Sequence, residues 1–116
     1  MVQMTVHVSE ELAERLRPIG PWLPTLLELS LVGYQTVATA TATEVIQFLS
    51  QQPTPREVLG YHVSARAQAR LQRLLALNAA GLVSEAERLE LDELQRIEHI
   101  IVMLKAQIAG QMPREP

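Results

Sequence analysis

Three histidines are the side chains best suited to metal binding or proton transfer, and their spacing argues against both. His7, His62 and His99 lie far apart, and Glu98 beside His99 would point to a different side of a helix. The chain has no cysteine, which excludes a thiol nucleophile, a thiolate metal site and a disulfide framework. We therefore expect no metal site and no cofactor.

The usual sequence signals of nucleophilic catalysis are missing as well. No strand–turn–helix motif presents a serine, and the five glycines are too scattered to form a phosphate-binding loop. The acids between residues 85 and 93 fall on one side of an expected helix, where such a run is usually solvated. The sequence predicts a protein that is not an enzyme and has no small-molecule substrate.

The most regular group of charges is formed by Arg66, Arg70 and Arg73. Their spacing of four and three residues places them on one face of a helix. One interpretation is pairing with acids of the following helix, for which the candidates are Glu90, Asp92 and Glu98. The other is a binding site for a phosphate backbone or an acidic partner helix.

Apolar periodicity and turn signals predict an αα-hairpin, two helices joined by a short turn, over residues 63–111. The second helix carries apolar side chains three or four residues apart, which places them on one stripe: Leu91, Leu94, Ile97, Ile101, Leu104 and Ile108. Gly81 suits the left-handed position that ends a helix, and Ser84 with Glu87 predicts a capping box for the next one. Ser64 is the expected cap of the first helix. We expect the stripe and the three arginines to bind a partner protein.

The first eight residues alternate between apolar and polar side chains. The apolar ones would lie on one face of a β-strand: Val2, Met4, Val6 and Val8. The opposite face would carry Gln3, Thr5 and His7. Because a single strand cannot satisfy its own backbone, we expect it to pair with the same strand of a second copy. Ser9 then caps a short helix that ends before Pro18, and a second helix runs from about residue 22 to Tyr34.

Strand, short helix, turn and helix over residues 2–34 resemble the start of ribbon-helix-helix DNA-binding proteins. The resemblance rests on the stretches TVHVSEELAERL and LPTLLELSLVGY. It implies a dimer whose paired strands enter the major groove, with Gln3, Thr5 and His7 facing the bases. Gln can pair with adenine, and Thr can bond a base edge or touch a thymine methyl. The alternative is that the strand only closes the core, since the ribbon has no Lys or Arg to neutralise phosphates.

The expected fold class is mainly α, with a dimeric ribbon-helix-helix-like start followed by short helices and the hairpin. Residues 1–34 would form the dimerisation or DNA-binding segment, 35–62 a connector with two short helices, 63–111 the hairpin and 112–116 a tail. Within the connector, residues 35–43 read as a second strand or an extended linker. The short helices would begin near Thr43 and at Thr54, where Pro55 suits the first helical position.

Two functions remain open. The resemblance implies an antitoxin-like or repressor-like dimer that binds operator DNA through its ribbon and a toxin through the hairpin. The alternative is a helical adaptor without a DNA role, whose hairpins self-associate between copies. A net charge of −3 argues against general nucleic-acid binding. We see no signal peptide and no apolar run long enough for a membrane helix, so we expect a cytoplasmic protein.

Overall fold

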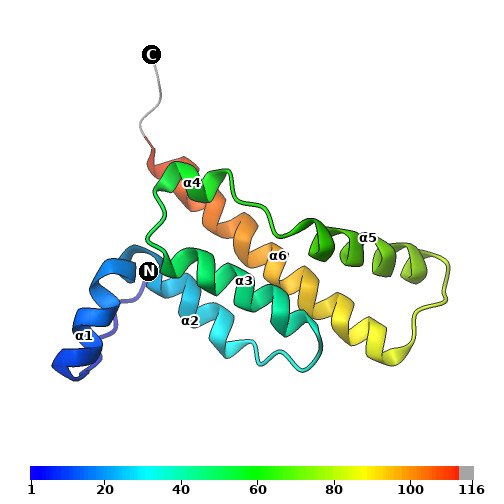
Figure 1. Ribbon diagram of the computed structural model, residues 1–116, viewed down its shortest axis with the longest axis horizontal. Coiled ribbons are helices and arrows are strands. Elements are labelled where there is room, and N and C mark those ends of the chain that lie inside the picture. Colours follow the sequence, from blue (N-terminus) through cyan, green and yellow to red (C-terminus); the bar gives the residue numbers. More distant parts are fainter. Residues whose placement is uncertain (113–116) are drawn as a thin grey trace, which may run out of the picture.

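A computed structural model describes residues 1–112, which form helices joined by turns and extended segments. In chain order these are α1 (Glu10–Leu16), the 3-10 helix η1 (Arg17–Trp22), α2 (Leu23–Leu31), α3 (Ala38–Ser50), α4 (Pro55–Leu59), α5 (Ala65–Ala79) and α6 (Glu85–Gln111). The long helix α6 is the centre of the arrangement, because α2, α3, α4 and α5 all pack against it (Figure 1). In the described part of the chain, no helix is long and apolar enough to cross a membrane.

Hydroxyl caps set the start of several helices. Ser9 Oγ accepts a hydrogen bond from the Leu12 amide at 3.2 Å, and Ser64 Oγ accepts one from Ala67 at the same distance. At α6 the capping box is complete: the Glu87 amide donates to Ser84 Oγ, and the Ser84 amide donates to Glu87 Oε1. The helix starts predicted at these three serines are confirmed.

The turn between α5 and α6 is a Schellman motif. Gly81 has a φ of +73°, in the left-handed region that glycine adopts without strain. The Gly81 amide donates to the Asn78 carbonyl at 3.1 Å, and the Leu82 amide donates to the Leu77 carbonyl at 2.9 Å. These bonds end α5 and turn the chain back along α6, which confirms the predicted hairpin.

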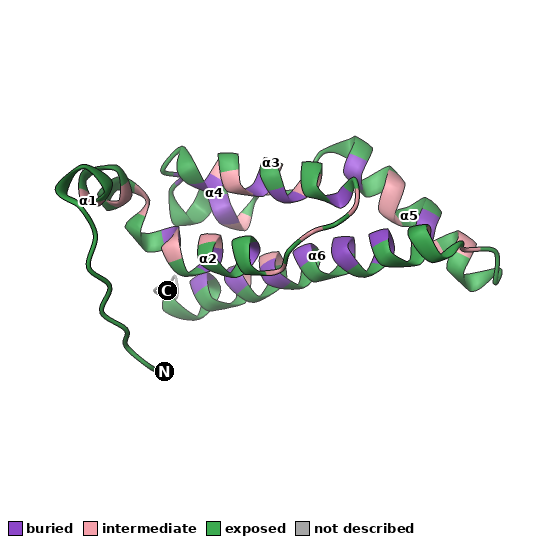
Figure 2. Ribbon diagram, turned by 90° about the horizontal axis from the view of Figure 1, so that it is seen from below, coloured by how far each residue is buried: buried purple, intermediate pink, exposed green. Residues whose placement is uncertain are grey.

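A single hydrophobic core lies between α6 and the helices that cover it. Figure 2 shows the buried positions on the sides of α2, α3 and α4 that face α6. The largest fully buried side chains come from five helices: Leu29, Val45, Leu49, Val58, Leu74 and Ile97. Burial of each is worth about 1.5–3 kcal/mol, so the hairpin and the helices before it are held together chiefly by this core.

The predicted amino-terminal strand is wrong. Residues 1–9 adopt neither helix nor strand, and residues 1–112 contain no sheet. The fold is therefore helical but not of the ribbon-helix-helix kind. Alternation alone does not make a strand, since the backbone needs a second strand to bond with and the described chain supplies none.

A second correction concerns residues 35–43, which were expected to be extended. From Ala38 onward they form the first turns of α3, a helix of 13 residues. Ala has the highest helix propensity, and a Thr can bond the carbonyl four residues before it, as Thr43 Oγ1 does with Thr39 at 2.9 Å. The Ala/Thr alternation thus fits a helix once tertiary contacts hold its start.

Candidate functional site

Residues 1–8, here called the arm, are the most exposed apolar segment of the described chain. Relative exposure is 90% at Val2, 85% at Met4, 71% at Val6 and 43% at Val8. Figure 2 shows the arm leaving the helical body beside α1, away from α5. Soluble monomers rarely leave such a run of apolar side chains in water, so the arm is a candidate interaction element.

The three residues expected to face DNA lie on this arm. Gln3, Thr5 and His7 are exposed, as are the apolar residues between them. Because the arm is not part of a sheet, its side chains are not sorted into an outward and an inward face. The three residues are close only because they lie on the same short stretch of chain, and the fold adds no further contact between them.

Helix α1 joins the arm to the body and is itself poorly anchored. Its seven residues include no buried side chain, and Leu12 is 42% exposed. Its packing is mainly against η1. Glu10, Glu11 and Glu14 give it an exposed acidic surface. The arm and α1 therefore form one protruding segment, apolar at its start and acidic at its end.

The predicted partner-binding stripe of α6 faces inward. Relative exposure is 8% or less for Leu91, Leu94, Ile97, Leu104 and Ile108, and Ile101 is partly buried. These side chains pack against the chain's own helices. A partner could reach them only by displacing those helices.

Within residues 1–112, one of the three arginines that were expected to bind or pair is held in an ion pair. Arg70 Nε donates to Glu90 Oε2 at 2.7 Å and Arg70 Nη2 to Glu90 Oε1 at 3.0 Å, a bidentate contact. Hydrogen bonding to Glu90 raises the pKa of Arg70. Arg66 and Arg73 are exposed on the same helix. The prediction that these arginines pair with the next helix is thus confirmed at Arg70.

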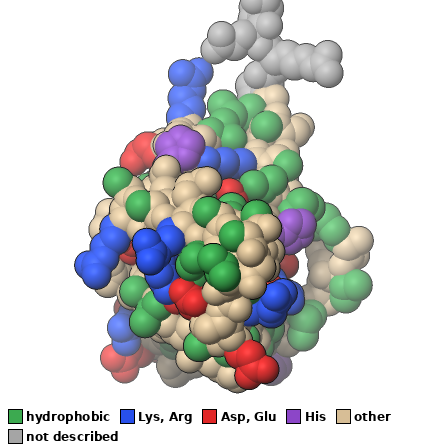
Figure 3. Space-filling model, turned by 90° about the vertical axis from the view of Figure 1, so that its right-hand side faces the viewer, with side chains coloured by type: hydrophobic (Ala, Val, Ile, Leu, Met, Phe, Trp, Pro, Cys, Tyr) green, Lys and Arg blue, Asp and Glu red, His purple; other side chains and the backbone are tan. Residues whose placement is uncertain are grey.

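A groove opens between α3 and α5, with α6 as its floor. We call it the α3–α5 groove; its volume is about 730 Å³. The side chains along it are mostly small or basic: Ala38, Ala40, Thr41 and Glu44 from α3, and Ala67, Ala69, Arg66, Arg70 and Arg73 from α5. Seen from the α5 end, basic, acidic and apolar side chains are interspersed on the surface (Figure 3). The groove can therefore take an occupant that is partly apolar and partly charged.

One carboxylate of this groove is partly buried. Glu44 lines the groove, and its Oε2 has almost no exposed surface and no hydrogen-bond donor among the described residues. A buried acceptor left without a donor is costly, and an occupant of the groove does not reach this atom while it is covered.

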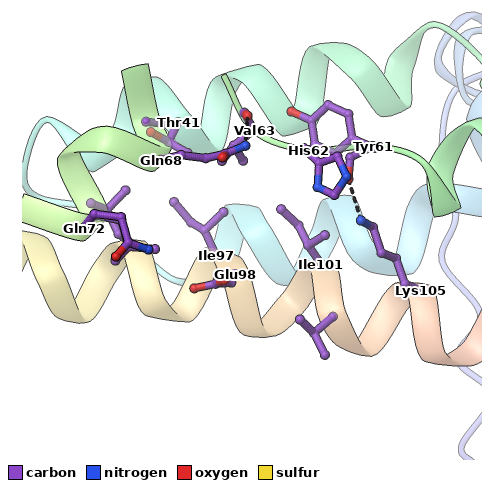
Figure 4. Close-up of a pocket in the computed structure, with 14 residues that line it drawn as sticks. Thr41, Tyr61, His62, Val63, Gln68, Gln72, Ile97, Glu98, Ile101 and Lys105 are labelled. Carbon is purple, nitrogen blue, oxygen red and sulfur yellow. Dashed lines mark hydrogen bonds between the residues drawn. The ribbon is translucent and has the colours of Figure 1, made fainter. Parts of the chain in front are cut away.

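A second hollow, of about 380 Å³, lies on the other side of α5, between residues 61–63 and α6. Figure 4 shows Tyr61, His62 and Lys105 at one end of it, with Ile97 and Ile101 along α6. Two of its polar side chains already bond to the chain itself. The Lys105 ammonium donates to the Tyr61 carbonyl, and Gln68 Nε2 donates to the Val63 carbonyl at 2.9 Å.

Tyr61, at that end of the hollow, has a structural role in packing. Tyr61 stacks on Phe48 with ring centroids 4.2 Å apart and an interplanar angle of 14°. Burial, and to a lesser degree the charge of Glu44, raises the pKa of the Tyr61 hydroxyl. A phenol with a raised pKa keeps its proton at neutral pH, so it is no nucleophile there.

The histidines do not come together in the fold. His7 lies on the arm, His62 in the segment before α5 and His99 on α6. Across residues 1–112, no group of three or more His, Cys, Asp or Glu side chains is placed to hold a metal ion.

Comparison with known proteins gives no relative from which to transfer a role. No protein-family model, no curated protein and no solved structure matches this chain. The function is therefore argued from the geometry described above.

Two features of the surface were missed at the sequence level. The α3–α5 groove depends on α3 being a helix, and residues 38–43 were expected to be extended. Glu44 follows Thr43, near which a short helix was expected to begin, but its place in the groove requires the tertiary packing of α5. The apolar run in the arm was visible, but it was assigned to a sheet.

Proposed function

We propose that this protein is a non-catalytic helical adaptor that associates with a second copy of itself through its amino-terminal arm. The observation that carries the proposal is the exposure of Val2, Met4, Val6 and Val8 on a segment that projects from a well-packed body. The hairpin stripe is a weaker candidate, because its side chains already fill the core. A DNA-reading ribbon is not carried forward, since residues 2–8 are not a strand.

The expected association is weak and reversible. Complete burial of one Val or Met side chain contributes about 1.5–3 kcal/mol, and the arm offers four such residues. Association itself costs about 4–15 kcal/mol in lost freedom and ordering of the arm. The two terms are of similar size, so we expect dimers that dissociate on dilution rather than a permanent complex.

Sedimentation velocity over a wide concentration range tests the proposal. The wild-type protein is compared with an arm variant that keeps the side-chain sizes but makes them polar: Val2→Thr, Met4→Gln, Val6→Thr and Val8→Thr. We expect the wild-type sedimentation coefficient to rise with concentration and that of the arm variant to stay at the monomer value. A wild-type protein that remains monomeric throughout, or an arm variant that associates equally well, would contradict the proposal.

A further inference from the structure

We propose that the α3–α5 groove is the receptor for the arm and α1 of the second copy. This inference rests on the self-association proposed above and names the surface that receives the protruding segment. The two surfaces lie toward opposite ends of the long axis, as Figures 1 and 2 show with α1 at one end and α5 at the other. An exchange of protruding segments between two copies would therefore give two identical contacts related by a two-fold axis.

The size of the groove suits a short helix. Its α3 wall includes Val37 and Glu44, which are about 11 Å apart along a helix at 1.5 Å per residue. Helix α1 has seven residues and thus a length of about 10 Å. The walls are lined by alanines from both helices, Ala38, Ala40, Ala67 and Ala69, which leave room for a helix or an extended chain to approach closely.

The charges of the two surfaces are complementary. The groove has three arginines against two glutamates, and the Arg70–Glu90 pair already neutralises one of each. Arg66 and Arg73 remain exposed on α5. The protruding segment brings Glu10, Glu11 and Glu14 with a single arginine, Arg15, on the same helix. Opposite charge across an interface fixes the register and raises the rate of encounter.

The acidic residue in the groove disfavours a free anion as the occupant. Glu44 lines the groove, and its carboxylate would repel a phosphate or carboxylate ligand bound between the arginines. The arm instead brings backbone N–H groups that form no helix or sheet bonds, so it can donate hydrogen bonds to acceptors exposed along the groove.

A charge exchange between the two surfaces tests the assignment. In the groove variant, Arg66 and Arg73 are replaced by Glu; in the helix variant, Glu11 and Glu14 are replaced by Arg. Each variant alone pairs like charges, so we expect its self-association to weaken by about tenfold or more in sedimentation experiments. An equimolar mixture of the two restores opposite charges at both contacts, and we expect affinity within about threefold of the wild type.

The mixture also reports on folding, since misfolded variants could not rescue each other. A matched control, Arg88→Glu with Arg96→Glu, makes the same change in net charge at exposed positions outside the groove and should leave association unchanged. Unaltered self-association in both charge variants, or no rescue in the mixture, would overturn the groove assignment. If the polar arm variant is nevertheless monomeric, the adaptor proposal survives and only the receptor surface is wrong.

Discussion

Glu93 shows how a single buried carboxylate can fix the position of a helix. It is 7% exposed, and it accepts hydrogen bonds from the amides of Gln35 and Thr36 at 2.8 and 3.3 Å and from Thr36 Oγ1 at 2.9 Å. Thr36 Oγ1 in turn accepts from the Ala38 amide at 3.1 Å. Glu93 therefore ties the start of α3 to α6 and positions one wall of the α3–α5 groove.

Replacing Glu93 by Ala should destabilise the protein by about 3 kcal/mol, because it leaves several partly buried donors without their charged acceptor. Urea unfolding followed by circular dichroism measures the loss. Asp92→Ala, at the exposed neighbouring position, is the control and should change the free energy of unfolding by less than about 0.5 kcal/mol. Equal effects of the two substitutions would show that the carboxylate does not hold α3.

Side-chain contacts between residues far apart in sequence could not be predicted from the sequence alone. The Arg70–Glu90 pair was among the expected pairs, since both residues lie on neighbouring helices of a hairpin with a short turn. The Glu93 contacts join residues 57 and 58 positions apart and were not expected. Helical periodicity reports which side of its own helix a residue occupies, but not which loop will meet it.

At the scale of elements, the start of α6 depends on a capping box. Ser84→Ala removes the acceptor for the Glu87 amide, and loss of such a cap costs about 1 kcal/mol. Urea unfolding should show this difference. Ser50→Ala, at an exposed serine whose hydroxyl donates only to a carbonyl of its own helix, is a suitable control and should have a smaller effect.

The same cap makes stability depend on pH. Hydrogen bonds from Ser84 lower the pKa of Glu87 below its ordinary value. A carboxyl with a lower pKa in the folded state stabilises that state above its unfolded pKa of about 4.3, and the contribution disappears as the pH falls through the folded pKa. Glu87→Gln should therefore be less stable than wild type at pH 6 and approach it at pH 3. A difference that is constant between these pH values would contradict the assignment.

Packing of α5 rests on one fully buried side chain. Leu74 has no exposed surface, so Leu74→Ala should cost about 2–5 kcal/mol. Leu82 is 71% exposed in the turn, and Leu82→Ala should cost less than about 1 kcal/mol. Thermal unfolding of the two variants gives the comparison. Similar melting temperatures would mean that α5 is not held by this contact.

The helices and extended segments differ in how well their conformation could be predicted from the sequence. The helices after Ser9, Ser64 and Ser84 were predicted because their caps and apolar periodicity are local signals. The arm and residues 35–43 were misread because alternation over a few residues fits a strand, an extended segment or an Ala/Thr helix equally well. Only the partner of each segment decides between these conformations, and that partner is remote in sequence.

At the scale of the whole molecule, the body and the arm have separate roles. Among residues 1–112, every buried hydrophobic residue lies between Trp22 and Ile108, so the arm contributes nothing to the core. The polar arm variant described above should therefore unfold in urea within about 0.5 kcal/mol of wild type while losing self-association. A large loss of stability in that variant would show that the arm belongs to the fold and not to an interface.

Hydrogen–deuterium exchange of the arm amides at low and high protein concentration tests the central claim most directly. Because these amides form no helix or sheet hydrogen bonds within the described residues, we predict rapid exchange in the dilute protein. At concentrations where the protein associates, residues 2–8 should become protected, while the exchange of core amides in α6 stays the same. Equally fast exchange of the arm at every concentration, in a sample that sedimentation shows to be associated, would contradict a role for the arm in that association.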